Sequence, residues 1–381
     1  MGMKKSVYTR LLWIAFMAFL FVRCANITKV TDSITNPDAR KIYEREFKTQ
    51  PDVFKSWEAV FNEAKSDSLS ISLPYGEKGT FNGSQNLIYS YTFQLTGGEV
   101  LTATVERDSI FKRVFTNIFE WDVSAKTFVE NGKTDTANVE FVPSHSGIYK
   151  VVIQPEIGAE TNFFIGLNKK PLYGFPVAGK GNDAIQSFWG NERDGGKRTH
   201  EGIDIFAKKG TPVVAVFDGT ISRTGEMGLG GKQVWQRTGM MGNSIYYAHL
   251  DSIAIASGAN VKVGDTLGFV GNTGNAKFTP PHLHFGIYKG YEGAVNPLPF
   301  VFNIPKITAK SYSKNFKSNV LKVKTASANL RQRPEMNGLK IGELNKEDEV
   351  FLLGEHKEWL HIQTGLNQRG FLHKSVVKEW K

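Results

Sequence analysis

The chain has 381 residues, of which 40% are hydrophobic, 12% aromatic and 22% charged. This length predicts two or three folded domains, and the composition excludes a disordered chain and a polytopic membrane protein. The single cysteine, Cys24, excludes an internal disulfide, so a metal site in the folded part has to use histidine and carboxylate ligands. The net charge of +10 suits nucleic acid, an anionic membrane or an anionic wall polymer, and does not choose among them.

Residues 1–24 have the layout of an export signal. Basic residues at Lys4, Lys5 and Arg10 precede an apolar run over residues 11–22. This run is shorter than the roughly 20 residues that span a bilayer, so a cleaved secretory signal is favoured over a transmembrane helix. Cys24 follows this run with only Arg23 between them, which resembles a bacterial lipoprotein signal. Three alternatives therefore remain open: lipidation of Cys24 with membrane anchoring, an ordinary cleaved signal, and an uncleaved anchor. In each case we expect the chain in the cell envelope, in the periplasm or on the outer surface.

Residues 25–66 are predicted to form a polar tether with some helix around residues 39–48, followed by an amphipathic helix. Pro51 can open this helix at its first position, and apolar residues then recur at three- and four-residue spacing. These residues are Val53, Trp57, Val60, Phe61 and Ala64. Over residues 67–168 the apolar period changes to two, which predicts a β-sandwich. Residues 141–155 resemble the closing strands of small sandwiches beside secreted peptidases, so we expect a helper or recognition role.

Residues 170–303 are rich in glycine turns and contain four histidines. Residues two apart in a strand point to the same face, so His282 and His284 share one side, about 7 Å apart. His249 lies at the end of the predicted strand SIYYAHL, on the same face as Tyr247. We therefore expect the functional site of the protein in this segment.

His200 and Asp204 are four residues apart, and this spacing alone is ambiguous. Four residues of an extended strand span about 13 Å, so both side chains reach one metal ion only if the chain bends at Gly202, as a glycine permits. Taken singly, each polar residue is explained as well by a hydrogen-bonded structural role.

Taken together, the motifs resemble the lysostaphin-type zinc metallopeptidases, which cut peptidoglycan peptides. The match covers about residues 175–300 and rests on SFWGNERD, HEGIDIFAKKGTPVVAVFDGTI, YYAHL, VKVGDTLGFVGNTG and PHLHF. The resemblance implies a β-rich zinc peptidase domain with an open antiparallel sheet. It also implies an exported zinc-dependent endopeptidase that hydrolyses bonds in peptidoglycan stem or cross-bridge peptides.

The same resemblance implies that His200, Asp204 and His284 ligate Zn²⁺, and that His249 and His282 are catalytic. Two histidines and one carboxylate leave a coordination position for water, whose pKa zinc lowers toward about 7, so that it can attack a peptide carbonyl. His249 and His282 would orient this water, stabilise the oxyanion and pass a proton to the leaving amine.

A basic linker over residues 304–320 precedes a segment, residues 321–381, that resembles bacterial SH3-like barrels. The resemblance rests on ANLRQRP, IGEL, EVFLL, WLHI and RGFLHKSVV. In that family the barrel usually binds cell-wall peptide and places an attached hydrolase, which implies contact with the cell wall through the C-terminal domain. A purely stabilising domain is the alternative.

The predicted fold class is therefore mainly β and multidomain, with an N-terminal β-sandwich, a zinc peptidase domain and a small C-terminal SH3-like barrel. The alternative function is a non-catalytic wall-binding protein that regulates another hydrolase. No nucleic-acid partner is expected, because an export signal is present and no nucleic-acid motif occurs.

Overall fold

The computed structural model of the protein describes residues 37–83, 86–108, 113–134, 137–238, 242–290 and 292–380. The predicted export signal with Cys24, and the predicted tether up to residue 36, lie outside these ranges. Antiparallel strands dominate the described part, so the predicted mainly β fold is confirmed. Within these ranges no helix is both long enough and apolar enough to cross a membrane.

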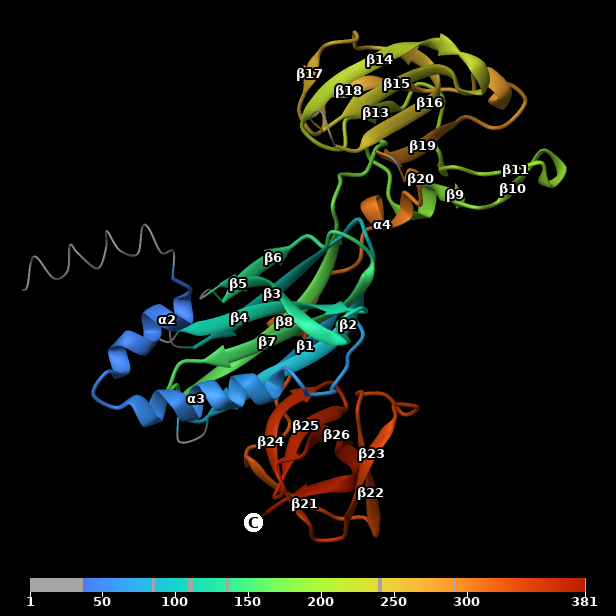
Figure 1. Cartoon of the computed structure of the whole chain (residues 1–381). Helices are drawn as coiled ribbons and strands as arrows, with labels where there is room; N and C mark the ends of the chain where they lie inside the picture. The colour runs from blue at the N-terminus through green and yellow to red at the C-terminus, as the bar shows by residue number, and fades with distance from the viewer. Residues whose placement is uncertain are drawn as a thin grey trace, which may run out of the picture.

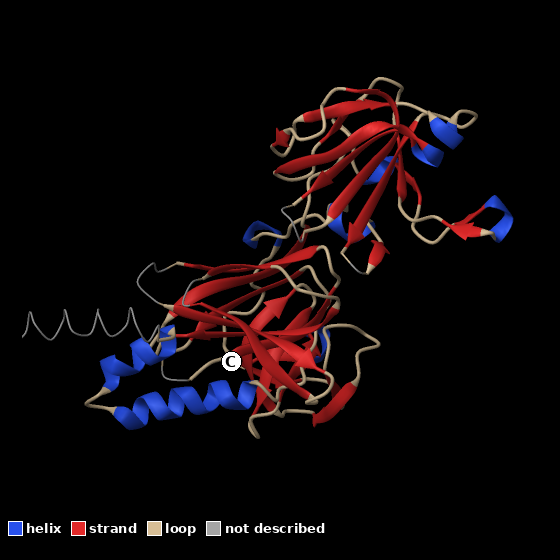
Figure 2. Cartoon of the chain, turned by 45° about the horizontal axis from the view of Figure 1, so that its top comes forward, coloured by secondary structure: helices blue, strands red, loops and turns tan. Residues whose placement is uncertain are grey.

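Two helices begin the described chain and lie along the sandwich (Figure 2). They are α2 (Ala39–Glu44), which continues into a 3₁₀ turn, and α3 (Pro51–Ala64). Both helices occur where the sequence predicted them. The buried face of α3 differs from the prediction at one position, because Phe54 is buried whereas Val53 is 40% exposed. The larger phenyl ring gains more free energy from leaving water, and it packs beside Trp57.

The sandwich consists of two four-stranded layers that enclose one apolar core. The first layer has the order β2-β7-β4-β5, with β2 (Tyr89–Leu95), β4 (Val114–Asp122), β5 (Thr127–Thr134) and β7 (Gly147–Pro155). The second has the order β1-β8-β3-β6, with β1 (Tyr75–Phe81), β3 (Glu99–Arg107), β6 (Asn138–Phe141) and β8 (Thr161–Pro171).

The central domain follows β8 and is built on a ten-stranded sheet in which every pair is antiparallel. Its main order is β17-β14-β15-β16-β19-β12-β9. The strands are β9 (Ile185–Ser187), β12 (Ile203–Phe206), β13 (Pro212–Val214), β14 (Gly219–Met227), β15 (Gly231–Arg237), β16 (Ser244–Ile253), β17 (Asn260–Val261), β18 (Thr266–Val270), β19 (His282–Lys289) and β20 (Gly293–Val295). A hairpin of β10 (Glu192–Arg193) and β11 (Arg198–Thr199) projects beside this sheet, and α4 (Leu298–Val301) ends the domain. The predicted open antiparallel sheet is confirmed.

The C-terminal module is a small set of bent antiparallel strands around its own apolar core. Its strands are β21 (Val320–Val323), β22 (Ser327–Arg331), β23 (Lys340–Asn345), β24 (Glu349–His356), β25 (Trp359–Thr364), β26 (Arg369–His373) and β27 (Val377–Glu379). That this module is an SH3-like barrel stays a prediction.

The C-terminal module returns to the sandwich after the chain has passed through the whole central domain. Strand β24 pairs antiparallel with β1, so Lys78 faces Glu355 and Gly79 faces Gly354. The two modules therefore share one continuous sheet, which runs from β23 to β6. Figure 1 shows them side by side, with the central domain set apart at the other end of the molecule.

The predicted linker, residues 304–320, packs on the sandwich for much of its length. The backbone N–H of Ile307 donates to Asn168 Oδ1 at 2.8 Å. Tyr312 is buried with its ring 5.4 Å from that of Phe164. The backbone N–H of Asn315 donates to the buried carboxylate of Glu355. This segment is thus a strap that binds the two modules together.

A fully buried carboxylate, that of Glu77, lies at the junction of the sandwich and the C-terminal module. It accepts hydrogen bonds from the hydroxyls of Tyr75 and Tyr91, and it lies 3.1 Å from Nδ1 of the buried His361. Burial acts to raise the pKa of Glu77, but His361 and the two hydroxyls outweigh burial and hold this pKa below its usual range. A buried carboxylate persists only when it is paired in this way, so the cluster requires that the two modules stay together.

We expect Gly354→Ala to destabilise the junction by about 1–3 kcal/mol, the usual cost of an overpacked core. A Cβ atom at this position would lie 2.0 Å from Glu77 Oε1. Gly365→Ala is the matched control, because a Cβ there meets no atom within 4 Å. Thermal unfolding of the full chain measures both variants, and equal melting temperatures for the two would contradict the role of Gly354.

Candidate metal centre

The central domain brings all five predicted site residues to one open pocket of about 870 Å³. Asp204 comes from β12, His249 from β16, and His282 and His284 from β19, while His200 lies in the turn before β12. Strands far apart in the sequence thus supply one site because they are neighbours in the sheet.

The pairing of β12 with β19 sets the centre of the site. Asp204 is directly opposite His284 in this antiparallel ladder, so their side chains leave the sheet on the same face. The predicted alternation along β19 is confirmed, since Leu283 and Phe285 are fully buried in the core on the other face.

Three potential ligand atoms form a small triangle. His200 Nε2 lies 3.0 Å from His284 Nδ1 and 3.0 Å from Asp204 Oδ1, and the latter two atoms are 3.1 Å apart. Tetrahedral zinc with bonds of about 2.0–2.1 Å holds its ligand atoms roughly 3.3 Å apart. The triangle therefore has the size and the donor set that a zinc ion requires.

The chain bends at Gly202, as the sequence predicted, and the missing side chain matters there for a second reason. A Cβ atom at this position would lie 2.6 Å from His284 Cε1 and 2.7 Å from the carbonyl oxygen of Phe285. The absence of a side chain thus lets the chain before β12 lie against the imidazole of His284, and this close approach brings His200 and Asp204 to the same point.

Backbone carbonyls fix the tautomers of three histidines, His200, His249 and His282. A carbonyl can only accept, so Nδ1 of each ring carries the proton and donates it, which leaves Nε2 with a free lone pair. The acceptors are the carbonyl oxygens of Phe188 (2.9 Å), Thr273 (3.0 Å) and Pro280 (2.8 Å), respectively. Hydrogen bonds of this kind orient metal ligands and catalytic imidazoles alike.

Burial favours the neutral imidazole at His249 and at His284. Burial lowers the pKa of His249 to about 4, with further contributions from His284 and His282, and burial also lowers the pKa of His284. Burial would raise the pKa of Asp204, but its interactions with His200 and His284 outweigh burial and hold this pKa well below its usual range. Neutral imidazoles and an ionised carboxylate are the forms that bind a metal.

His249 does not alternate with its neighbours as the sequence predicted. It lies inside β16 rather than at its end, its φ is 62°, and the pairing of β15 with β16 shifts register between Tyr247 and Leu250. This bulge turns His249 to the face of Tyr246, which lines the pocket, while Tyr247 is buried in the core. A left-handed conformation at a histidine is strained, and such strain gathers at functional sites.

Arg193 is a site residue that sequence reasoning missed. Its Nη2 donates to Asp204 Oδ2 at 3.0 Å and to Ser187 Oγ at 2.6 Å, from the β10–β11 hairpin. The two oxygens of Asp204 are thus divided: Oδ1 faces the two histidines and Oδ2 is held by the guanidinium. The motif SFWGNERD contains Arg193, but nothing in the spacing shows that this side chain reaches Asp204.

An antiparallel sheet that presents two histidines and a carboxylate to an open pocket, with two more histidines beside them, is the arrangement of a metallopeptidase catalytic domain. Residues 198–297, which include all five residues, match the sequence model described as Peptidase family M23. The resemblance to lysostaphin-type metallopeptidases is confirmed for this domain, which we call the peptidase domain from here on.

Three curated relatives show how far the similarity reaches. The L-Ala–D-Glu endopeptidase of Bacillus subtilis is 37% identical over 126 residues, which is 31% of this chain and 38% of the relative. The DD-carboxypeptidase/endopeptidase Mpg of Neisseria meningitidis serogroup B is 40% identical over 111 residues, 29% of this chain and 25% of the relative. The glycyl-glycine endopeptidase ALE-1 of Staphylococcus capitis is 30% identical over 207 residues, 48% of this chain and 55% of the relative. The chain thus spans from a quarter to about half of the length of these relatives, whose names specify different bonds.

We expect Arg193→Gln to weaken zinc binding by about 10-fold or more, the scale of losing a partner that orients a metal ligand. Arg193→Lys should restore part of the affinity, because it keeps the charge beside Asp204. Competition with a chelator measures the dissociation constant. Arg198→Gln is the control, since Arg198 is on the same hairpin and pairs with Asp194 instead. Unchanged zinc affinity in Arg193→Gln would refute this role.

Proposed function

We propose that the protein is an exported zinc-dependent endopeptidase that hydrolyses peptide bonds in peptidoglycan stem or cross-bridge peptides. The observation that carries the proposal is the triangle of His200 Nε2, Asp204 Oδ1 and His284 Nδ1, with edges of 3.0 to 3.1 Å, inside a domain of Peptidase family M23. The names of the three relatives support peptide bonds of the cell wall as the substrate class.

Zinc suits the proposed ligands because imidazole and carboxylate are both common zinc donors, and three protein ligands leave one position open. When bound, zinc would supply Lewis-acid chemistry: it polarises a peptide carbonyl and lowers the pKa of a coordinated water to about 7. Arg193 keeps Asp204 oriented with Oδ1 toward the two histidine ligands. The open pocket admits an extended peptide beside this centre.

His249 and His282 are proposed to handle protons and charge during hydrolysis. Their rings lie 5.1 Å apart, and the ring of His249 is 5.8 Å from that of His284. With Nδ1 of each bound to a carbonyl, Nε2 is free to accept a proton from water, to donate it to the leaving amine, and to stabilise the developing oxyanion. The lowered pKa of His249 makes it a neutral acceptor at neutral pH.

The alternative, a non-catalytic wall-binding regulator, is disfavoured by the same pocket, which contains every side chain that the proposed hydrolysis requires. The proposed location is the cell envelope, and it rests on the predicted export signal and on the substrate class. Lipidation of Cys24 and wall contact through the C-terminal module are proposed as the means of keeping the enzyme near its substrate. The direct test is to incubate the purified protein with peptidoglycan and to identify released fragments by mass; absence of any cleaved peptide would overturn the proposal.

We expect Asp204→Ala and His284→Ala to lose most of their bound zinc, because a site with two protein ligands binds zinc weakly. Metal analysis of the purified variants gives the zinc content per chain. Asp183→Ala removes an exposed carboxylate of the same domain and serves as the control. Stoichiometric zinc in either ligand variant would show that the ligand set is wrong.

For His249→Ala and His282→Ala we expect zinc to be retained and hydrolysis to fall by roughly 100-fold or more, the scale of losing an oxyanion donor or a proton-transfer group. Turnover of a soluble peptide and zinc content are measured on the same samples. His145→Ala, an exposed histidine of the sandwich, is the control. A variant that cleaves at the parental rate, or that loses its zinc, would exclude the role given to that histidine.

A further inference from the structure

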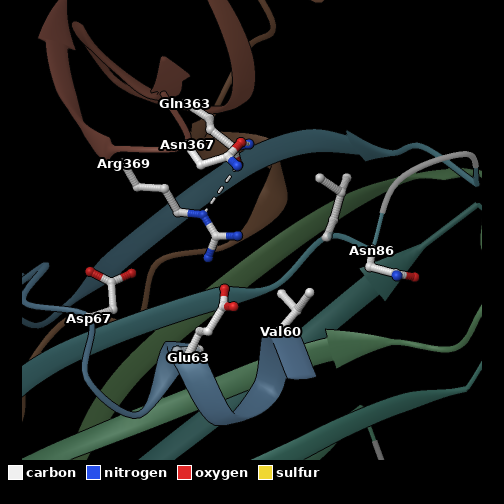
Figure 3. Close-up of a pocket in the computed structure, with 9 residues that line it drawn as sticks. Val60, Glu63, Asp67, Asn86, Gln363, Asn367 and Arg369 are labelled. Carbon is white, nitrogen blue, oxygen red and sulfur yellow. Dashed lines mark hydrogen bonds between the residues drawn. The ribbon is translucent and has the colours of Figure 1, made fainter. Parts of the chain in front are cut away.

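A second pocket, of about 500 Å³, lies at the junction of the sandwich and the C-terminal module (Figure 3). One wall is the last part of α3 with the segment that follows it, another is the segment before β2, and the third is the hairpin of β25 and β26. We call it the junction pocket. It exists only because β24 joins β1, since neither module alone contains all its walls.

Arg369 presents its guanidinium to this pocket. Its Nε faces Gln363 Oε1 at 3.4 Å, and Gln363 Nε2 in turn donates to Asn367 Oδ1 at 2.9 Å. Within the described ranges its two terminal nitrogens make no hydrogen bond. Figure 3 shows them directed into the pocket, toward α3. A partly buried guanidinium with free donors is suited to a carboxylate, which it can bind through two parallel hydrogen bonds.

The opposite wall carries a free negative charge. The carboxylate of Asp67 is already occupied, because it accepts from the backbone N–H of Leu69 and from Ser90 Oγ. Glu63, on an exposed face of α3, has no side-chain partner among the residues that the structure describes. The end of α3 is held in place by Lys150, whose buried Nζ donates to the carbonyl oxygens of Lys65 and Asp67 at 2.6 Å. Glu63 is therefore an available carboxylate on an anchored helix end, and it can pair with an ammonium group.

The rest of the lining suits a peptide. Asn86, Gln363 and Asn367 supply carboxamides that can bind peptide N–H and carbonyl groups. Val60, Ala64 and Leu87 provide a small apolar surface. Phosphate-rich polymers fit less well, because Glu63 and Asp67 would repel them.

We propose that the junction pocket binds a short peptide that has both a free carboxylate and a free amino group, with Arg369 on the carboxylate and Glu63 on the ammonium. The identification of this ligand with a wall peptide rests on the proposed function, since peptidoglycan peptides carry both groups. The pocket lies between the sandwich and the C-terminal module, and the peptidase domain is set apart from it (Figure 1), so a peptide bound here retains the enzyme on its polymer without occupying the metal centre.

Trialanine, its C-terminal amide and its N-acetyl derivative test this proposal, because they differ only in the two charged ends. NMR titration of the full chain carrying His284→Ala measures binding without hydrolysis. We expect Arg369→Gln to weaken binding of trialanine by about 10-fold, the scale of losing one charge-assisted pair, and to leave the weaker binding of the amide unchanged. We expect Glu63→Gln to weaken binding of trialanine and to leave binding of the N-acetyl derivative unchanged.

Lys346→Gln, which removes an exposed charge of the same module away from the pocket, should bind trialanine as the parent does. Equal binding of trialanine by the parent and by Arg369→Gln would overturn the proposal, as would no binding at millimolar peptide. If Arg369→Gln lowers the melting temperature, the trialanine affinity of Glu63→Gln alone tests the proposal, because Glu63 is exposed. Unchanged trialanine binding by Glu63→Gln would then overturn it. The zinc-loaded chain with Arg369→Gln should hydrolyse a soluble peptide at the parental rate. Peptide binding therefore tests the junction pocket, and hydrolysis of the soluble peptide separately tests the peptidase assignment.

Discussion

The antiparallel pairing of β12 with β19 is the constraint on which the metal centre depends. It places Asp204 opposite His284, and the same strand β19 carries His282 two residues earlier. The neighbouring strand β16 then brings His249 to the site, although only through a bulge and a strained backbone at that residue. The positions of these side chains thus depend on the backbone hydrogen bonds of a sheet, which is a more rigid support than a loop.

A second sheet contact, between β1 and β24, determines the rest of the architecture. It places the buried Glu77 against His361 and closes the junction pocket between α3 and the β25–β26 hairpin. The peptidase domain is therefore attached at both of its ends to one continuous platform of sandwich and C-terminal module. Removal of the C-terminal module would expose the carboxylate of Glu77 and part of the sandwich core, so its contribution extends beyond any contact with the wall.

The two proposed sites have complementary physical tasks. The metal centre has to bind its transition state more tightly than its substrate, whereas the junction pocket has only to raise the local concentration of the polymer, for which weak binding is sufficient. Because the junction pocket lies outside the peptidase domain, both sites can be occupied by one network of peptide chains. An enzyme of this form would act on a polymer more effectively than on a small soluble peptide.

The sequence by itself determined the mainly β fold, both N-terminal helices and the order of the motifs that contain the five predicted site residues, because alternation, helical spacing and motif order are local properties of the chain. It could not show that Arg193 holds Asp204, that His249 turns to the face of Tyr246, or that residues 304–320 form a packed strap. Those features depend on which strands become neighbours and where a register shifts. The pairing of the sandwich with the C-terminal module was decided only by the tertiary structure. Glu77 and His361 are 284 residues apart, and burial of each side chain is tolerated only when the other is present.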